Sequence, residues 1–223
     1  MKVSLISITQ PILRPQESIL SAEDLIVYCA RVSNPSNQLN FETGAGLLKY
    51  CIKHGHWSIF EQASFSVEIK TSRAIAAQIL RHKSFSFQEF SQRYALVQNM
   101  EPVELRAQAV KNRQSSTELI NDAALSYEVA EHIESSLALY NKLIEHNVAK
   151  ECARNVLPLT TETTMYMHGT VRSWIHYVNL REKPDTQKEH RLIAEEVKSL
   201  MMKNFPVISE ALGYKAGPPE TSQ

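Results

Sequence analysis

Apolar and polar residues alternate along some stretches of the chain, and this pattern predicts its strands. Phe65, Val67 and Ile69 share one face of a predicted strand over 64–72. Over 1–9 the apolar residues fall on both faces, so we expect a strand that is buried on both sides. A shorter strand is predicted over 91–97.

Other stretches carry apolar residues at helical spacing. Ser21, with Asp24 three residues later, predicts an N-cap with a variant of the capping box. Gly55 is expected to end the second helix, and Pro184 with Asp185 to open the last one. The predicted helices cover 21–33, 43–55, 72–82, 115–146, 151–158, 169–181 and 183–205.

These elements follow one another without a regular strand–helix–strand rhythm, which indicates an α+β fold. The length of 223 residues is typical of one large domain, and no repeat or linker divides the chain. We therefore expect a single domain over 1–223, with a frayed tail over about 213–223.

Charge and cysteine usage exclude several classes of protein. Lys plus Arg and Asp plus Glu number 24 each, so the basic excess of a non-specific nucleic-acid-binding protein is missing, although a local anion site is still possible. The start of the chain does not resemble a secretory signal, and no apolar run reaches the length of a membrane span. The three cysteines lie far apart, which argues against disulfides and structural zinc. A soluble, cytoplasmic protein is expected.

Nucleotide-binding glycine motifs are absent. Gly44 and Gly46 form a GxG, but Lys49 stands where a dinucleotide fingerprint needs its third glycine, and there is no P-loop. The phosphates of a bound nucleotide would therefore be held by side chains, chiefly by arginine.

Five arginines in apolar surroundings are candidates for this role. An arginine in such a setting is either paired with a carboxylate or faces an anionic ligand. Taken alone, Arg154 or Arg172 is more often a structural ion-pair partner, so the positions of the arginines indicate only a pocket for a phosphorylated small molecule. The five are Arg81, Arg93, Arg154, Arg172 and Arg181.

The stretch RHKSFSFQEFSQRY, residues 81–94, resembles the signature of the flavin-dependent thymidylate synthases, the ThyX family. That signature is Arg-His-Arg, seven residues, Ser, one residue and Arg; here Arg81, His82, Ser91 and Arg93 match it. HWSIFEQASFSVEI, ARNVLP, RSWIHYVNLR and TQKEHR resemble further family segments in the same order, and the resemblance extends from about 30 to 212. Lys83 departs from the pattern: it keeps the charge of the usual arginine but lacks the planar fork, which bears on the grip on the flavin pyrophosphate.

The resemblance implies a mainly antiparallel sheet flanked by helices, and a homotetramer whose sites are shared between subunits. Assembly would then bury the polar signature. The implied dUMP contacts are Gln78, Ile79, Leu80, Arg81, Glu89, Phe90, Ser91, Gln92, Arg93, Arg154 and Arg181. The implied FAD contacts are Ser58, Arg81, His82, Lys83, Glu89, Thr170, Val171, Arg172 and His176, with His56 near the flavin and the folate.

The reaction implied by the resemblance is reductive methylation of dUMP to dTMP. Methylenetetrahydrofolate would give the carbon, and FAD reduced by NADPH would give the hydride; no metal is implied. Arg181 would stabilise negative charge on the uracil ring and is the catalytic candidate. Ser91 is expected to hydrogen-bond the nucleotide rather than attack it, because no base is clearly placed to activate it; His82 and Glu89 are only candidates for one.

Two alternatives stay open. Lys83 leaves room for a flavin enzyme that makes a different modified pyrimidine nucleotide. An inactive relative that serves in binding or assembly is the other alternative, and the presence together of Arg81, Ser91, Arg93, Arg154 and Arg181 argues against it. The choice between NADPH and NADH has no readable motif, and the polar turn over 34–44 is a candidate mobile lid.

Overall fold

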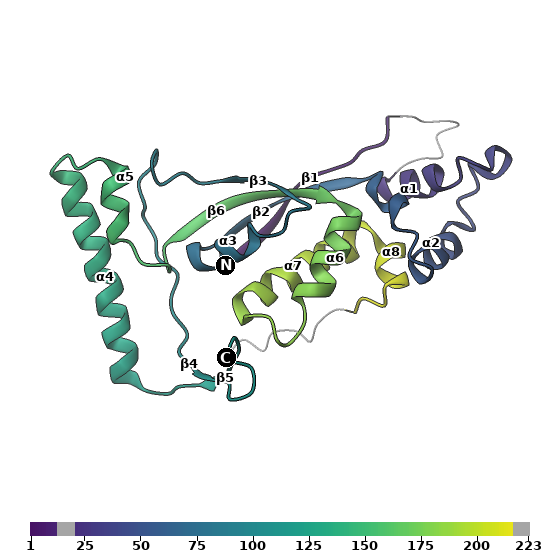
Figure 1. Ribbon diagram of the computed structural model, residues 1–223. Helices are drawn as coiled ribbons and strands as arrows, with labels where there is room; N and C mark the ends of the chain where they lie inside the picture. The colour runs from purple at the N-terminus through teal and green to yellow at the C-terminus, as the bar shows by residue number, and fades with distance from the viewer. Residues whose placement is uncertain (13–20, 216–223) are drawn as a thin grey trace.

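The computed structural model describes residues 1–12 and 21–215, and it has the predicted α+β architecture (Figure 1). Its main sheet has four strands in the order β1-β2-β6-β3, and every neighbouring pair is antiparallel. The strands are β1 (Lys2–Ile8), β2 (Ser64–Ser72), β6 (Glu162–Thr170) and β3 (Ser86–Glu89). A separate hairpin pairs β4 (Arg106–Gln108) with β5 (Ser116–Leu119).

The inner strands of the sheet are β2 and β6, which pair along nine residues. The prediction for β2 is confirmed, with Phe65, Val67 and Ile69 buried on one face. β6 was not predicted, because its sequence ETTMYMHGT carries only two strongly apolar residues on the buried face, Met165 and Met167.

Two strand predictions are wrong in part or in full. β1 is an edge strand rather than one buried on both sides, and the side chain of Ile6 is 52% exposed. The register shifts between Leu5 and Ser7, so Ile6 is an extra residue that turns outward at a bulge. Residues 91–97 form a turn in which the backbone N–H of Tyr94 donates to Ser91, and the strand of this region is the earlier β3.

Helices cover one face of the sheet and one end of it. α3, α6 and α7 lie beneath the sheet in Figure 1, whereas α1, α2 and α8 gather at one end of the molecule. The predicted cap of α1 is confirmed: Ser21 and Asp24 form a capping box with both hydrogen bonds present. The helices are α1 (Ala22–Ala30), α2 (Gly44–Lys53), α3 (Arg73–Ile79), α4 (Ala123–Glu145), α5 (Lys150–Ala153), α6 (Val171–Arg181), α7 (Lys188–Asn204) and α8 (Pro206–Ala211), with 3-10 turns η2 (Pro35–Asn37), η3 (Trp57–Glu61) and η4 (Arg154–Val156).

Two predicted helices begin later than expected. α4 starts at Ala123 rather than at 115, because residues 116–119 pair with β4 and the Asp122 side chain then caps the helix. α7 starts at Lys188 rather than at 183, and α8 follows it without having been predicted.

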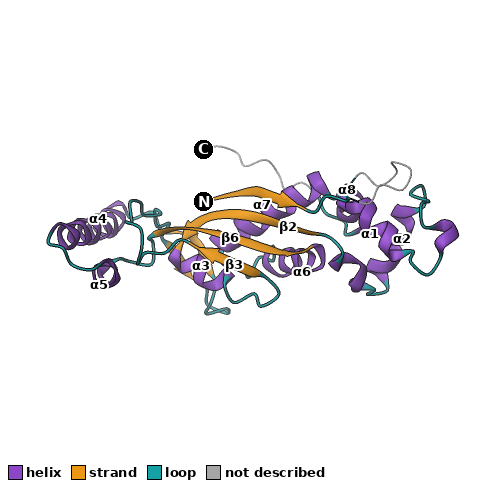
Figure 2. Ribbon diagram, turned by 90° about the horizontal axis from the view of Figure 1, so that it is seen from above, coloured by secondary structure: helices purple, strands orange, loops and turns teal. Residues whose placement is uncertain are grey.

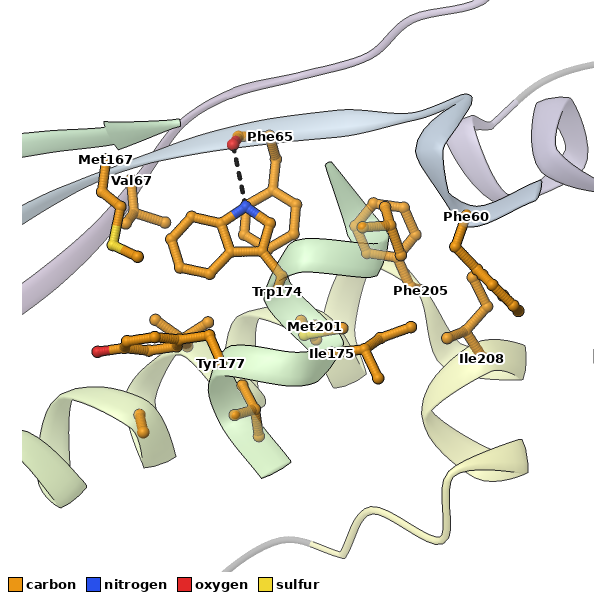
Figure 3. Close-up of a cluster of buried hydrophobic side chains, with 14 of the residues drawn as sticks. Phe60, Phe65, Val67, Met167, Trp174, Ile175, Tyr177, Met201, Phe205 and Ile208 are labelled. Atoms are coloured by element: carbon orange, nitrogen blue, oxygen red, sulfur yellow. Dashed lines mark hydrogen bonds between the residues drawn. The ribbon is translucent and has the colours of Figure 1, made fainter. Parts of the chain in front are cut away.

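The core lies between the sheet and the helices beneath it, and Trp174 is at its centre (Figure 3). The indole ring is fully buried and stacks on Phe65 at 4.7 Å between centroids, and its Nε1–H donates to the Phe65 carbonyl at 3.1 Å. Phe85 of the signature stretch packs on the same indole and against Gly169, where an added Cβ would stand 2.5 Å from the ring. The signature is therefore anchored to the core through Phe85.

α4 and α5 form an arm that stands away from the sheet in both views (Figures 1 and 2). A second apolar cluster packs around Tyr140, in the part of α4 that precedes α5. Along α4 only Tyr140 is buried, whereas Leu125, Tyr127 and Leu139 are exposed by 42%, 68% and 46%. Much of the apolar surface of α4 is thus uncovered within one chain.

The start of the predicted frayed tail packs on the body. The Tyr214 hydroxyl donates to Asn179 Oδ1 at 3.0 Å, while 216–223 lie outside the described residues. Residues 34–44 form successive turns around η2, and their role as a lid stays a prediction, as does the single domain over 1–223. Within the described ranges, no helix combines the length and apolarity needed to cross a bilayer.

Candidate functional site

One group of predicted site residues meets where α3 and α6 end. The Arg181 Nε–H donates to Nε2 of His82 at 2.9 Å, which joins the end of α6 to the signature stretch. Gln78, in the last turn of α3, donates to Gln187 at 2.6 Å and faces Nδ1 of His190 at 3.3 Å. Arg81 follows α3 with an exposed side chain.

The environment keeps His82 neutral. Burial lowers the pKa of His82 to about 4, and the positive charges of Arg181 and Arg81 add to this effect. Its Nε2 therefore carries a lone pair that accepts from Arg181, and the proton of the neutral ring lies on Nδ1. Nε of Arg181 is used in this way, and the two terminal nitrogens of its guanidinium have no bond to the described residues, so they can donate to a ligand.

The two histidines of this region predict a loss of stability in acid. Burial also lowers the pKa of His190, to about 3. Since both folded-state pKa values lie below about 6.5, the ordinary value, the unfolded chain takes up protons first. The free energy of unfolding should therefore fall as the pH drops from about 6.5 to about 4. Urea unfolding at pH 7.5, 6.0 and 4.5 measures this slope, and His190→Gln should make it shallower; an equal slope in both proteins would contradict the prediction.

A second group of predicted residues lies between β3 and the arm. The Glu89 carboxylate is paired with Arg73, and it accepts from the Thr163 hydroxyl at 3.0 Å. Arg93 lies 3.3 Å from the Glu151 carboxylate of α5, and Arg154 opens η4 directly after that helix. The signature stretch therefore connects both groups.

Neither candidate base for Ser91 is hydrogen-bonded to it in the described chain. His82 is bonded to Arg181, and Glu89 is bonded to Arg73 and Thr163, so both candidate bases are engaged elsewhere. The Ser91 side chain is exposed at the turn that follows β3. This arrangement favours the predicted hydrogen-bonding role over a nucleophilic one.

The predicted flavin contacts gather where η3 meets the start of α6. The Thr170 hydroxyl caps α6 by accepting from the Ser173 N–H at 3.2 Å. Arg172 donates to the Glu61 carboxylate at 2.6 Å, and the His176 ring lies 5.0 Å from that of Trp57. Exposed residues of the same region are His56, which precedes η3, and Ser58 within it; Lys83 is exposed in the signature stretch.

Burial limits what some predicted residues can do. The side chains of Ile79 and Val171 are fully buried in the core, so only their backbone could reach a ligand. The Gln92 side chain is buried at 9% exposure, and Leu80 and Phe90 are half-buried.

The structure separates the five arginines into two classes. Arg93 and Arg172 each have a carboxylate partner. Within the part of the chain that the structure describes, Arg81, Arg154 and Arg181 have no carboxylate within 4.0 Å. These three are the arginines that an anionic ligand could meet without competition.

Sequence reasoning missed His190 and Tyr177, which lie behind this group. Both are fully buried, their rings are 5.7 Å apart, and neither His190 Nε2 nor the Tyr177 hydroxyl has a hydrogen-bond partner in the described chain. The Tyr177 ring also packs on that of His82 at 4.9 Å. A signal was present, because His190 occupies the apolar stripe of α7.

A cavity of about 410 Å³ opens between hairpin β4–β5 and the start of α7. Its walls include Arg106, Ser115 and Gln187, and it touches the predicted site through the bond of Gln187 to Gln78. Among the described residues, no three His, Cys, Asp or Glu side chains are grouped so that they could hold a metal ion.

Comparison with known proteins identifies the family of this chain. Residues 17–207 match the family model described as "Thymidylate synthase complementing protein". The chain is 51% identical over 218 residues to a probable flavin-dependent thymidylate synthase of Paramecium bursaria Chlorella virus 1, covering 96% of this chain and 100% of the relative. It is 49% identical over 217 residues to the flavin-dependent thymidylate synthase of Synechocystis, with the same coverage.

A solved structure is also similar. The UMP/dUMP methylase PolB from Streptomyces cacaoi, bound with 5-Br dUMP, superposes with a TM-score of 0.78 at 25% sequence identity, over 95% of this chain and 94% of that one. Both the sequence match and the fold extend over nearly the whole chain. The chain therefore belongs to the thymidylate synthase complementing protein family, the flavin-dependent thymidylate synthases.

Proposed function

We propose that this protein converts dUMP to dTMP by reductive methylation. Methylenetetrahydrofolate supplies the carbon, and FAD recharged by NADPH supplies the hydride. The observation that carries the proposal is that Arg81, Arg154 and Arg181 have no carboxylate partner in the described chain, and that Arg181 donates to a His82 held neutral. The names of the relatives and the brominated nucleotide in the similar structure support the same substrate.

Arg181 has the central role. Its Nε is held by His82, so the guanidinium is oriented before the nucleotide arrives. The two terminal nitrogens then donate to the uracil ring, where negative charge must be stabilised for carbon 5 to become nucleophilic. Arg81, Arg93 and Arg154 bind the phosphate and orient the nucleotide, and Ser91 donates to it.

The residues around η3 and α6 fit a flavin nucleotide. Arg172, at the start of α6, and Lys83 offer positive charge for the pyrophosphate. The exposed ring of His176 against Trp57 is an apolar and hydrogen-bonding surface for an aromatic ring system. When bound, the flavin supplies the hydride, while the protein positions it and excludes water. His56, exposed beside this surface, is assigned to the folate side.

The sites are shared between the subunits of a homotetramer in the cytoplasm. Figures 1 and 2 show α5 and α6 well apart. Arg154, which directly follows α5, and Arg181, which ends α6, would therefore meet at one site only from different subunits. The exposed apolar side chains of α4, Leu125, Tyr127 and Leu139, give a second copy a surface to cover. Light scattering of the purified protein tests the tetramer.

The function is tested by anaerobic incubation of the protein with FAD, NADPH, methylenetetrahydrofolate and dUMP, followed by mass spectrometry of the nucleotide. We expect a methyl group in place of one hydrogen, together with tetrahydrofolate. Unchanged dUMP with continued NADPH consumption would overturn the one-carbon step. A parallel reaction with UMP tests the second candidate, methylation of another pyrimidine nucleotide, because the similar structure is a UMP/dUMP methylase.

A further inference from the structure

A chain of hydrogen bonds joins Gln78 to hairpin β4–β5. Nε2 of Gln78 donates to Oε1 of Gln187 at 2.6 Å, and Nε2 of Gln187 donates to Oε2 of Glu189 at 2.9 Å. The second oxygen of Glu189 accepts from Nη2 of Arg106 at 2.6 Å. At its other end the chain continues from Gln78 Oε1 to Nδ1 of His190, 3.3 Å away. Four elements, α3, α7, the loop before α7 and the hairpin, thus share one hydrogen-bonded path.

The direction of this path follows from the carboxylate at Glu189. An ionised carboxylate only accepts hydrogen bonds, so Gln187 must turn its NH₂ group to Glu189 and its oxygen to Gln78. Gln78 must then donate with its NH₂ and turn its oxygen to His190, whose Nδ1 has to carry the proton. One carboxylate therefore sets the orientation of two amides and the tautomer of a buried histidine.

Arg106 holds the carboxylate in place. Its side chain is only 12% exposed, and its other nitrogens donate to Glu104 Oε1 at 2.6 Å and to Ser116 Oγ at 2.9 Å. Burial by itself raises the pKa of Glu189, but hydrogen bonds from its own backbone, from Arg106 and from Gln187 outweigh this, so that the pKa lies below its ordinary value. Glu189 is therefore ionised at neutral pH and acts as an acceptor only.

We propose that Glu189 is a positioning residue for the nucleotide site, acting through Gln187 on the carboxamide of Gln78. The inference rests on the proposed function, in which Gln78 contacts dUMP. Among the described residues, the Gln78 carboxamide has one N–H and one oxygen lone pair without a partner, and the order of the hydrogen-bonded path decides which of them faces the nucleotide. An unrestrained carboxamide would present either group, and the nucleotide would then have to select one of the two orientations.

The test replaces this carboxylate by the amide of equal size. In Glu189→Gln the oxygen of the introduced amide must face Arg106, which only donates, so its NH₂ group turns to Gln187 and the order of hydrogen bonds along the path is reversed. We expect the dissociation constant of dUMP to rise about three- to tenfold, the range that loss of one net hydrogen bond predicts, with kcat at saturating dUMP and the unfolding midpoint almost unchanged. Isothermal titration with dUMP, steady-state kinetics and urea unfolding measure the three quantities.

A double variant distinguishes chain order from a simple loss of charge. Gln187→Glu combined with Glu189→Gln moves the carboxylate one link nearer to Gln78, which again donates to an acceptor-only group, while the amide beside Arg106 still offers it an oxygen. We expect dUMP affinity to return close to that of the wild type. A role confined to the ion pair with Arg106 would leave the double variant as weak as the single one.

The matched control is Glu104→Gln, which removes the other carboxylate that Arg106 contacts. Glu104 is not part of the hydrogen-bonded path from Glu189 to Gln78. It should leave dUMP affinity unchanged. Normal affinity in Glu189→Gln, failure of the double variant to recover, or an equal loss in Glu104→Gln would each overturn the inference while wild-type binding stands. Absence of dUMP binding in the wild type would instead overturn the proposed function, and the inference with it.

Discussion

Replacing Arg181 with alanine is expected to lower kcat/KM for dUMP methylation by about 10²- to 10³-fold, the usual cost of removing one preorganised donor to developing negative charge. The structure supports this expectation, because His82 fixes the guanidinium through Nε and no carboxylate within the described chain competes for its other nitrogens. Alanine removes both the charge and its orientation, and leaves the neutral ring of His82 without its donor.

Two further variants locate the effect. Arg181→Lys keeps the charge but cannot bond His82 and the uracil ring with one planar group, so most of the loss should persist. Arg113→Lys, on the exposed turn of hairpin β4–β5, is the matched control and should have wild-type kinetics. Steady-state assays with varied dUMP, together with unfolding midpoints, separate catalysis from folding. Near-normal turnover in Arg181→Ala would contradict the assignment of this residue.

Replacing Trp174 with alanine is expected to lower the free energy of unfolding by about 3–5 kcal/mol, the typical cost of emptying a large buried aromatic site. The indole is fully buried, lies 4.7 Å from the ring of Phe65 and 4.6 Å from that of Phe85, and donates to the Phe65 carbonyl. Its removal would loosen both β2 and the signature stretch, so we also expect weaker FAD binding.

The milder variant Trp174→Phe tests the source of this stability. It keeps a ring against Phe65 but loses the Nε1–H donor, so the loss should be smaller than for alanine. Urea unfolding at neutral pH gives the two free energies, and FAD titration followed by absorbance gives the cofactor affinity. A change of less than about 1 kcal/mol for alanine, the average cost of an ordinary substitution, would show that the indole site collapses without penalty.

Local chemistry explains which elements could be predicted. The caps at Ser21 and the alternation of β2 act between near neighbours, so α1 and β2 were read correctly. β6 is a strand because β2 and β3 pair with it on its two sides. Of the four residues on its buried face, only Met165 and Met167 are strongly apolar. Residues 115–122 have apolar residues at helical spacing, but they do not form a helix. Residues 116–119 pair with β4, and the Asp122 side chain caps the helix that begins at Ala123.

The sequence by itself determined the family and the chemical types at the site, because the spacing of Arg81, His82, Ser91 and Arg93 lies within a single short segment. Only the tertiary structure decided what each group is bonded to. Arg172 is bonded to Glu61, 111 positions away in the sequence, and Gln78 is bonded to Gln187, 109 positions away. Arg181 donates to a neutral histidine, His82, and not to a carboxylate. Charge pairing and burial depend on distances in space, and for segments this far apart the fold alone brings the partners together.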